Sequence, residues 1–185
     1  MNTSENPKMG AYTFKCFTHE QVKEINKEIK TQESKKQDPA KAARNVSKIG
    51  EFSIVPCEPL MEILHPWLYQ CQVVNRDIYG YNIDWQFHLD FMNYNVYGEN
   101  GEYDWHIDGT GGDTLSDIKL TCLLNLSEET YEGGEFHTIN DSGGKHDFAP
   151  GMGLILNSLI AHQVTPVTKG ERITLTYWAQ GPAWR

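Results

Sequence analysis

Apolar residues near the start of the chain recur at the spacing of a helix. In the segment "THEQVKEINKEIK", which begins at Thr18, the residues Val22, Ile25 and Ile29 fall on one helical face. Thr18 is a suitable N-cap, and Gln21 three residues later can complete a capping box. The pattern predicts a surface helix over this segment.

A second apolar stripe lies in "EPLMEILHPWLYQCQVVNRDIYG", the stretch that ends at Gly80. Its members share helical spacing and are Leu60, Leu64, Leu68 and Cys71. Pro66 interrupts the stripe, and a proline inside a helix removes a backbone hydrogen bond. We therefore expect a break or kink after His65, which gives either two short helices or one bent helix.

Between these two helical segments the chain is polar. Residues 31–48, "TQESKKQDPAKAARNVSK", contain almost no apolar side chains and several cationic ones. Such a segment buries too little apolar surface to offset the cost of ordering its backbone. We expect a mobile loop, with a lid over a substrate as the alternative.

From residue 85 onward the period changes from that of a helix to that of a strand. In "WQFHLDFMNYNVY", residues 85–97, apolar and polar residues alternate, which predicts a half-buried strand. The strand-like segments that follow are "YDWHID", "IKLTCLLNL", "GEFHTIN", "KHDFAP", "MGLILN", "AHQVTPV" and "RITLTYWAQ". Glycine-rich turns such as "GTGGD" and "DSGG" separate them.

The order of these elements predicts the fold class. Short strands at even intervals behind a helical part are typical of a sandwich or jelly roll with helices on one face. We expect a mainly β fold with flanking α-helices. Residues 1–185 would form one domain, with a helical N-terminal part over about 1–80 and a β core over about 85–180.

Composition and charge narrow the classes of function. The formal net charge of −9 disfavours a nucleic-acid partner, because such surfaces neutralise phosphates with clustered Lys and Arg. The polar start "MNTSENPKMG" lacks an apolar signal-peptide core, and no apolar run is long enough to span a membrane. We expect a cytoplasmic protein. The four cysteines form no CxxC pair, which favours free thiols.

The segment "YDWHIDGTGG" places His106 and Asp108 one residue apart. Alternate side chains of a strand leave on the same face, so both could point at one metal ion. The alternative is a polar strand end in which a neighbour satisfies His106. His162, at the start of a late strand, is the best candidate for a third ligand. Two histidines and one carboxylate on one face of an octahedral ion suit non-haem Fe(II) enzymes, because they leave open positions.

Arg172 lies ten residues beyond His162, in "GERITLTYW". It shares a strand face with Thr174 and Thr176, and such a face would otherwise be expected to be apolar. A guanidinium pairs with a carboxylate through two parallel hydrogen bonds, so an anionic ligand is expected, to which Thr174 could add a hydroxyl. A salt bridge to an acidic neighbour is the alternative.

Together these motifs resemble the 2-oxoglutarate- and Fe(II)-dependent dioxygenases, specifically the prolyl 4-hydroxylase-like branch that includes the PKHD-type hydroxylases. The similarity spans residues 85–180. The matching segments are "NYNVYGENGEYDWHID", "LTCLLNLSEETYEGGEF" and "PGMGLILNSLIAHQVTPVTKGERITLTYW". The resemblance implies a double-stranded β-helix, which is the cupin-like jelly-roll barrel of that family.

The resemblance also implies a role for each matching residue. The catalytic ligands of Fe(II) would be His106, Asp108 and His162. Arg172 would bind the distal carboxylate of 2-oxoglutarate. Tyr97 matches the tyrosine that commonly contacts the same carboxylate in the family, and Tyr103 is a second candidate for this contact.

The implied reaction consumes 2-oxoglutarate and O2, with ascorbate as an accessory reductant, and releases succinate and CO2 while an unactivated C–H bond is hydroxylated. The substrate would be a prolyl or other residue of a protein or peptide, or a small molecule. The collagen-type prolyl hydroxylases usually have Lys where this chain has Arg172, which favours the PKHD-type side of the branch. A catalytically silent, cupin-like module that binds a metal or ligand is the alternative.

Two further pairs of residues could bind a metal or line a pocket. Glu135 and His137 alternate on a predicted strand and could hold a second metal, but the resemblance places them outside the iron site, where solvent-facing polar roles are expected. Trp105 and Trp178 are expected to be packing groups. Trp178 shares a strand face with Arg172 and has the pocket wall as its alternative.

Overall fold

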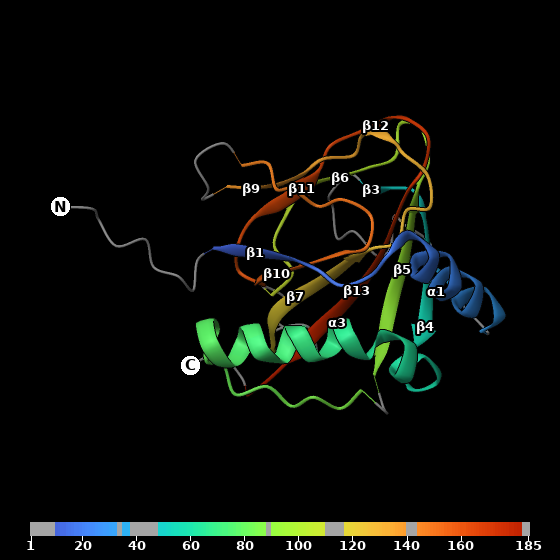
Figure 1. Cartoon of the computed structure of the whole chain (residues 1–185). Helices are drawn as coiled ribbons and strands as arrows, with labels where there is room; N and C mark the ends of the chain where they lie inside the picture. Colours follow the sequence, from blue (N-terminus) through green and yellow to red (C-terminus); the bar gives the residue numbers. More distant parts are fainter. Residues whose placement is uncertain are drawn as a thin grey trace.

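The computed structural model describes residues 10–32, 35–37, 48–87, 90–109, 117–139 and 144–182. Two β-sheets face each other, and the helices cover the outer side of the larger sheet (Figure 1). Because most of the described elements are strands and the helices lie on one side, the predicted class, mainly β with flanking helices, is confirmed.

The larger sheet has seven strands in the order β1-β10-β7-β13-β5-β4-β2. They are β1 (Ala11–Lys15), β10 (Met152–Asn157), β7 (Ile118–Asn125), β13 (Arg172–Gln180), β5 (Phe91–Tyr97), β4 (Glu51–Pro56) and β2 (Lys35–Gln37). All described pairings in it are antiparallel. Strands from both ends of the chain therefore meet in one sheet.

The smaller sheet has four strands in the order β3-β6-β11-β9. They are β3 (Lys48–Ile49), β6 (Glu102–His106), β11 (His162–Val164) and β9 (Phe136–Thr138). A separate pair is formed by β8 (Glu132–Gly133) and β12 (Val167–Lys169). The short strands of this sheet form the second wall of the space between the sheets.

Strand β13 shows how the sequence builds the two faces of the larger sheet. Ile173, Leu175 and Tyr177 are buried in the core that the helices cover. Arg172 and the alternate residues after it point the other way, into the space between the sheets. One strand therefore serves the apolar core on one face and a polar cavity on the other.

Helix α1 (His19–Thr31) follows the predicted pattern. Thr18 and Gln21 form the capping box, and the predicted stripe is buried. Asn26 is buried beside this stripe, and its amide donates to the carbonyl of Leu126 at 2.8 Å and accepts from the Tyr94 hydroxyl at 3.1 Å. A buried polar side chain is tolerated there because it is hydrogen-bonded.

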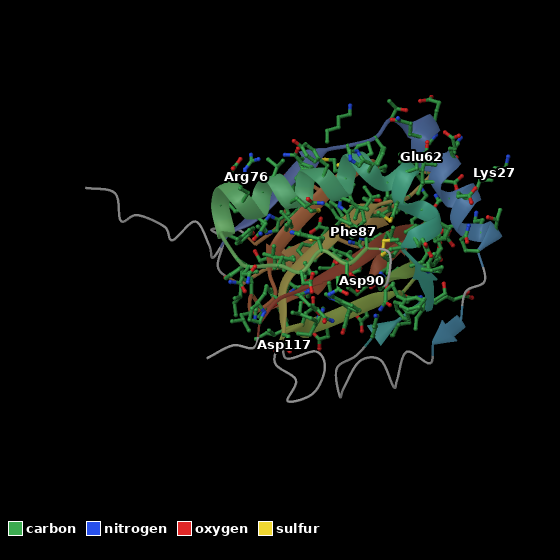
Figure 2. All side chains as sticks on the ribbon, turned by 90° about the horizontal axis from the view of Figure 1, so that it is seen from below. Lys27, Glu62, Arg76, Phe87, Asp90 and Asp117 are labelled. Carbon is green, nitrogen blue, oxygen red and sulfur yellow. The ribbon has the colours of Figure 1, made fainter. Side chains whose placement is uncertain are left out.

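Helix α3 (Met61–Val74) runs through Pro66 without a break, so of the two alternatives the pair of short helices is wrong and a single helix is observed. A short 3₁₀ turn (Glu58–Leu60) precedes it and a π turn (Asn75–Tyr79) follows. Its apolar face is fully buried on the sheet, and the indole of Trp67 donates to the carbonyl of Leu123 at 3.1 Å. Burial of this face outweighs the one hydrogen bond that proline removes. Figure 2 shows α3 crossing the sheet.

The strand predicted over residues 85–97 is shorter than expected, because β5 begins only at Phe91. Trp85 and Phe87 lie before the strand and still pack on the ring of Tyr177, with ring centroids 6.2 and 5.2 Å apart. Phe91 is 61% exposed, contrary to the alternating pattern. The apolar residues at alternate positions before Phe91 therefore belong to an irregular segment that packs on the core. Residues 88 and 89 lie outside the described range.

Two polar segments also differ from the predictions. The expected loop over residues 31–48 contains β2, which pairs with β4, and ends in Lys48 of β3; residues 33–34 and 38–47 of that prediction lie outside the described residues. "KHDFAP" forms no strand, and only Lys145 makes an isolated bridge, to His137. Pairing of β2 with β4 decided the first case, and such pairing leaves little local signal in the sequence.

Two chain-wide expectations concern the membrane and the cysteines. No helix among the described residues is long and apolar enough to cross a membrane. The four cysteines lie in the described part of the chain and are free, as predicted, with Cys57, Cys71 and Cys122 buried. Burial raises the pKa of the Cys16 and Cys57 thiols to about 12. The thiols are therefore protonated at neutral pH.

We predict that Leu64→Ala lowers the free energy of unfolding by about 2–5 kcal/mol, because it opens a cavity under α3. Leu64 is fully buried, whereas Met61 on the same helix is 36% exposed. Met61→Ala is the matched control and should change stability by about 0.5 kcal/mol or less. Urea denaturation followed by circular dichroism measures both. Equal effects of the two changes would contradict the burial of this helix face.

Candidate metal centre and its pocket

A cavity of about 400 Å³, part of which is open to solvent, lies between the two sheets. Its walls come from β5, β7 and β13 of the larger sheet and from the smaller sheet. The lining residues are Lys48, Asn95, Tyr97, Tyr103, His106, Asp108, Thr121, Leu123, Phe136, His162, Val164, Arg172, Thr174, Thr176 and Trp178. The cavity therefore contains all seven residues that the sequence analysis assigned to iron and 2-oxoglutarate.

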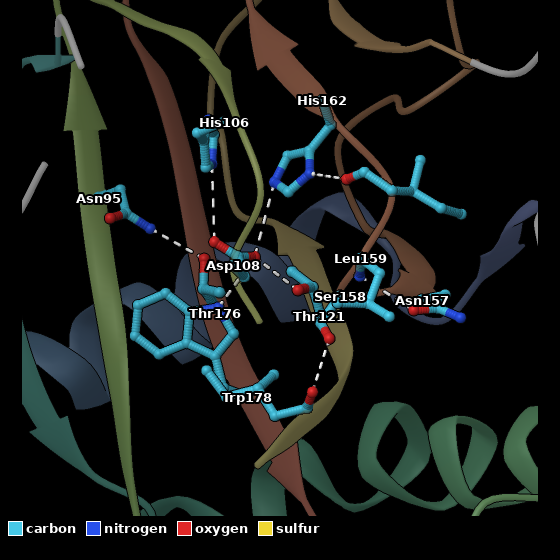
Figure 3. Close-up of polar contacts among 12 residues, drawn as sticks. Asn95, His106, Asp108, Thr121, Asn157, Ser158, Leu159, His162, Thr176 and Trp178 are labelled. Carbon is cyan, nitrogen blue, oxygen red and sulfur yellow. Dashed lines mark hydrogen bonds and ion pairs between the residues drawn. The ribbon is translucent and has the colours of Figure 1, made fainter. Parts of the chain in front are cut away.

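The three predicted metal ligands converge in this cavity. His106 ends β6, and His162 begins β11 directly opposite it in the sheet. Nε2 of His106 lies 3.7 Å from Oδ1 of Asp108, and Nε2 of His162 lies 3.6 Å from Oδ2 of Asp108 (Figure 3). Pairing of the two strands thus brings distant parts of the sequence to one point.

Backbone carbonyls orient both imidazole rings. Nδ1 of His106 lies 2.7 Å from the carbonyl of Asp104, and Nδ1 of His162 lies 2.8 Å from the carbonyl of Ile160. Because a carbonyl can only accept, each Nδ1 carries the proton and donates. Each Nε2 therefore presents its lone pair to the cavity, which is the form that binds a metal.

The backbone around Asp108 is fixed by a close approach to the segment before His162. The amide of Asp108 donates to the carbonyl of Ser158 at 3.1 Å. Gly109 comes next, and a Cβ there would lie 2.5 Å from Oγ of Ser158. The glycine thus permits the close approach that places the carboxylate between the histidines.

The carboxylate of Asp108 is held by two donors from the larger sheet. Thr121 Oγ1 donates to Oδ2 at 2.5 Å, and Trp178 Nε1 donates to the same oxygen at 3.1 Å. Burial acts to raise the pKa of Asp108, but the two histidines and these two hydrogen bonds outweigh it, so the pKa is lowered. Asp108 is therefore ionised at neutral pH.

The pKa of His106 is lowered to about 4, first by burial and next by the neighbouring His162. The imidazole is neutral at pH 7 and can act as a ligand. Two imidazole nitrogens and one carboxylate oxygen, all within 4.8 Å of one another, form a candidate site for a metal ion. No other group of this kind occurs in the described part of the chain. The donors fit a facial set of two histidines and one carboxylate, which suits Fe(II).

Arg172 lies at the start of β13, next to Tyr97 of β5 in the sheet. It is only 1% exposed, and its Nε has no hydrogen-bond partner among the described residues. Its guanidinium carbon lies 5.4 Å from the centre of the Tyr97 ring and 5.7 Å from that of Phe148. A buried guanidinium with an unused donor is suited to an anionic ligand, so the alternative of a salt bridge to an acidic neighbour has no support here.

Tyr97 and Thr174 complete the surroundings of the guanidinium. Burial raises the pKa of Tyr97 to about 12, although Arg172 opposes the effect, so the phenol is a neutral donor at pH 7. Thr174 is buried and lines the same cavity. Tyr103 packs against the cluster of Phe52, Tyr97 and Val167, and its ring also stacks on His106 with 3.5 Å between centroids. It therefore links the surroundings of Tyr97 to a predicted metal ligand.

Several cavity residues were not singled out from the sequence. Asn95 of β5 donates to Oγ1 of Thr176 on β13 at 3.1 Å (Figure 3). Thr121, which helps to fix Asp108, also belongs to this group. Trp178 was singled out, and for it the pocket wall, the alternative to a packing role, is the correct one. The available signal was the occurrence of polar residues at alternate positions of otherwise apolar strands.

The remaining candidates lie away from the cavity. Glu135 accepts from Lys145 at 2.5 Å and lies 3.0 Å from the ring of His137, which agrees with the expected polar roles. Trp105 is 42% exposed, so its expected role as a packing group is wrong. The side chains of Trp105 and of the preceding residue, Asp104, are both exposed on β6, whereas that of His106 lines the cavity.

Sequence comparisons agree with the predicted resemblance. The sequence model of the 2OG-Fe(II) oxygenase superfamily matches residues 92–180. A PKHD-type hydroxylase of Rhizorhabdus wittichii is 36% identical over 74 residues, which cover 39% of this chain and 32% of that protein. One from Xylella fastidiosa strain M12 is 43% identical over 67 residues, or 35% of this chain and 28% of the relative. The matching part thus spans about a third of the length of these relatives.

Solved structures confirm the fold. A Pseudomonas putida prolyl-4-hydroxylase has a TM-score of 0.65 at 17% identity, over 95% of this chain and 94% of that one. The viral collagen prolyl hydroxylase of Paramecium Bursaria Chlorella virus-1 has a TM-score of 0.66 at 16% identity, over 93% and 96%. A Trichoplax adhaerens prolyl hydroxylase, solved with a peptide of hypoxia inducible factor, has a TM-score of 0.66 at 18% identity, over 92% and 83%. The two sheets therefore form the predicted jelly roll.

We predict that Trp178→Phe weakens Mn(II) binding by about 10- to 100-fold, because the variant removes a donor that orients Asp108. Trp105→Phe is the matched control, since Trp105 is exposed, and should bind Mn(II) as the wild type does. Titration followed by electron paramagnetic resonance of free Mn(II) measures both affinities. Unchanged binding in Trp178→Phe would show that the indole does not support the metal centre.

Proposed function

We propose, from the match of residues 92–180 to the 2OG-Fe(II) oxygenase superfamily, that the protein is a prolyl 4-hydroxylase-like hydroxylase that uses 2-oxoglutarate and O2. One observation carries the proposal. The His106, Asp108 and His162 side chains and the buried guanidinium of Arg172 line a single cavity. A cavity with a metal-binding face and a separate anion-binding group matches a co-substrate that has a chelating end and a distal carboxylate.

In this proposal Fe(II) is held by Nε2 of His106, Nε2 of His162 and the carboxylate of Asp108. Iron held there would supply the chemistry that couples the oxidative decarboxylation of 2-oxoglutarate, which yields succinate and CO2, to the hydroxylation of a C–H bond. Three protein ligands leave positions for the co-substrate and O2. The carbonyl contacts of both Nδ1 atoms keep the imidazoles oriented throughout.

The chain holds the distal carboxylate of 2-oxoglutarate with Arg172. Its guanidinium can donate two parallel hydrogen bonds, and the unused buried Nε shows that this donor capacity is available. The Thr174 hydroxyl lies two residues further on the same strand face, and the Tyr97 phenol lies on the adjacent strand. These three groups bind and orient the co-substrate.

In this proposal the oxidised substrate lies in the cavity beside Tyr103 and the three metal ligands. Tyr103 stacks on His106 and shields that ring from water. We propose a protein or peptide substrate, oxidised at a prolyl or other residue, because the Trichoplax adhaerens neighbour was solved with a peptide. Arg172 in place of the lysine of collagen-type enzymes favours the PKHD-type side, to which the sequence relatives belong.

We predict that Asp108→Ala abolishes release of succinate from 2-oxoglutarate, because a facial set without its carboxylate holds Fe(II) weakly. The assay contains Fe(II), 2-oxoglutarate, O2 and ascorbate, the reductant expected from the resemblance. Asp104→Ala is the matched control, since Asp104 is exposed and its side chain binds only the adjacent backbone amide. Full turnover in Asp108→Ala would refute the ligand assignment. Binding of 2-oxoglutarate without succinate in the wild type would favour a silent binding module.

We predict that Arg172→Ala weakens 2-oxoglutarate binding by about 30-fold or more, since truncating one partner of a buried charge pair costs about 2–5 kcal/mol. The 2-oxoglutarate affinity of Arg172→Lys should fall between those of the wild type and Arg172→Ala, because lysine keeps the positive charge but cannot donate two parallel hydrogen bonds. Anaerobic calorimetry with the Mn(II)-loaded protein separates binding from chemistry. Mn(II) affinity should change little in both variants. Equal 2-oxoglutarate affinity in wild type and Arg172→Ala would exclude this role.

A further inference from the structure

Lys48 lines the cavity and has no part in the proposed binding of iron or 2-oxoglutarate. It lies on β3, whose backbone pairs with β6 so that Lys48 stands opposite Tyr103 (Figure 1). The next residue, Ile49, is 50% exposed, which shows that the two side chains of this short strand point to opposite sides. The lysine side chain therefore points inward at the Tyr103 side of the cavity.

Two aromatic rings hold the ammonium group of Lys48. Its Nζ lies 3.8 Å from the centre of the Phe52 ring and 4.6 Å from that of Tyr103. Such contacts stabilise a cation and fix its position. Since Tyr103 also stacks on His106, the ammonium lies one ring away from a metal ligand.

No carboxylate of the described residues lies within ion-pair distance of Lys48. Asp108 is the single acidic residue among those that line the cavity, and the two histidines, Thr121 and Trp178 occupy its oxygens. Burial lowers the pKa of Lys48 to about 8, and Asp108 only partly opposes this. An anion that binds near Lys48 would stabilise the positive charge of its ammonium group.

In the proposed function both carboxylates of 2-oxoglutarate have other partners: one would lie at the metal site and the other would pair with Arg172. Arg172 adjoins Tyr97 and Phe148, and Lys48 adjoins Tyr103 and Phe52, whose ring centre lies 5.6 Å from that of Tyr97. With both co-substrate carboxylates engaged, the molecule left to pair with Lys48 is the one that is oxidised.

We propose that Lys48 binds an acidic group of the oxidised substrate, so that the enzyme acts on a carbon near a carboxylate. This inference rests on the proposed function of the same site. The carboxylate belongs either to an acidic residue of a peptide or to a small carboxylic acid. Lys48 thus acts as a specificity-determining residue that selects substrates with a negative charge.

The test uses the Mn(II)-loaded protein with saturating 2-oxoglutarate and no oxygen. Bound Mn(II) broadens the NMR signals of a probe that occupies the cavity, so the readout does not depend on turnover. The peptide arm compares N-acetyl-glutamate α-amide with N-acetyl-glutamine amide, and the small-acid arm compares butyrate with butyramide. In each pair the charge differs while the shape is nearly the same.

We predict that at least one acid binds about tenfold or more tightly than its amide. A charge pair in a partly desolvated cavity contributes more binding free energy than a pair on the exposed surface does. Lys48→Met should remove this preference, and Lys48→Arg should retain it. Lys169→Met is the matched control, since Lys169 is exposed, pairs with Glu132 and lies outside the cavity lining. It should behave as the wild type. Preference in only one arm identifies the source of the carboxylate.

Two outcomes would overturn the role of Lys48. One is equal behaviour of acid and amide in the wild type in both arms, and the other is an acid preference that survives in Lys48→Met. Calorimetry of 2-oxoglutarate with Lys48→Met should give an affinity within about twofold of wild type, because no charge pair with the co-substrate is lost. A loss as large as that in Arg172→Ala would assign Lys48 to the co-substrate instead. Failure of the wild type to bind 2-oxoglutarate would refute the proposed function itself, so the two failures are distinguishable.

Discussion

The buried carboxylate of Asp108 is the constraint on which the rest of the site depends. Its side chain is 8% exposed, and an isolated carboxylate in such a position would take up a proton. It remains ionised because imidazoles and two neutral donors surround it, yet the pKa of His106 shows that this ring is neutral. The negative charge therefore has the neutral imidazole of His106 beside it. A divalent metal ion would supply an opposite charge there, which supports the proposal that the three groups form a metal centre.

The two faces of the larger sheet have different roles: one packs the apolar core and the other lines the cavity. The face toward α1 and α3 is apolar and holds the larger core cluster. The opposite face carries Arg172, Asn95 and several threonines at the positions where a simple sandwich would bury aliphatic residues. Polar groups in a core are costly unless each has a partner, and here the strands supply many of the partners to one another. The helix-covered core offsets the cost of this polar interior.

Much of the fold and of the proposed site could be read from local sequence patterns. Helix α1 and strand β13 follow directly from periodicity, because the same residues that set the period are those that become buried. The spacing of His106 and Asp108 and the position of Arg172 were also visible, since each lies within one strand or just beyond it. These features needed no knowledge of which strands pair.

The features that sequence reasoning missed depend on contacts between distant segments. Helix α3 continues through Pro66 because burial on the sheet compensates a local defect, and Phe91 is exposed because β5 starts later than the alternation indicated. The hydrogen bond from Trp178 to Asp108 and the place of Lys48 opposite Tyr103 both arise from strand pairing. Local propensity says little about such pairings, so a basic residue at the edge of a polar segment gave no sign of its place in the cavity.

The charge of the cavity is opposite to that of the protein. The chain carries a net charge of −9, whereas the cavity walls contain Lys48 and Arg172 against the single carboxylate of Asp108. At physiological ionic strength the solution screens exposed charges over about 8 Å, so charges on the acidic exterior act less on a ligand in the cavity than the charged groups that line it. The local cations, together with the divalent metal of the proposed function, would therefore set a preference for anions. In this proposal an acidic protein can bind a dianionic co-substrate, because groups in direct contact with the ligand select it more strongly than the field of the whole molecule does.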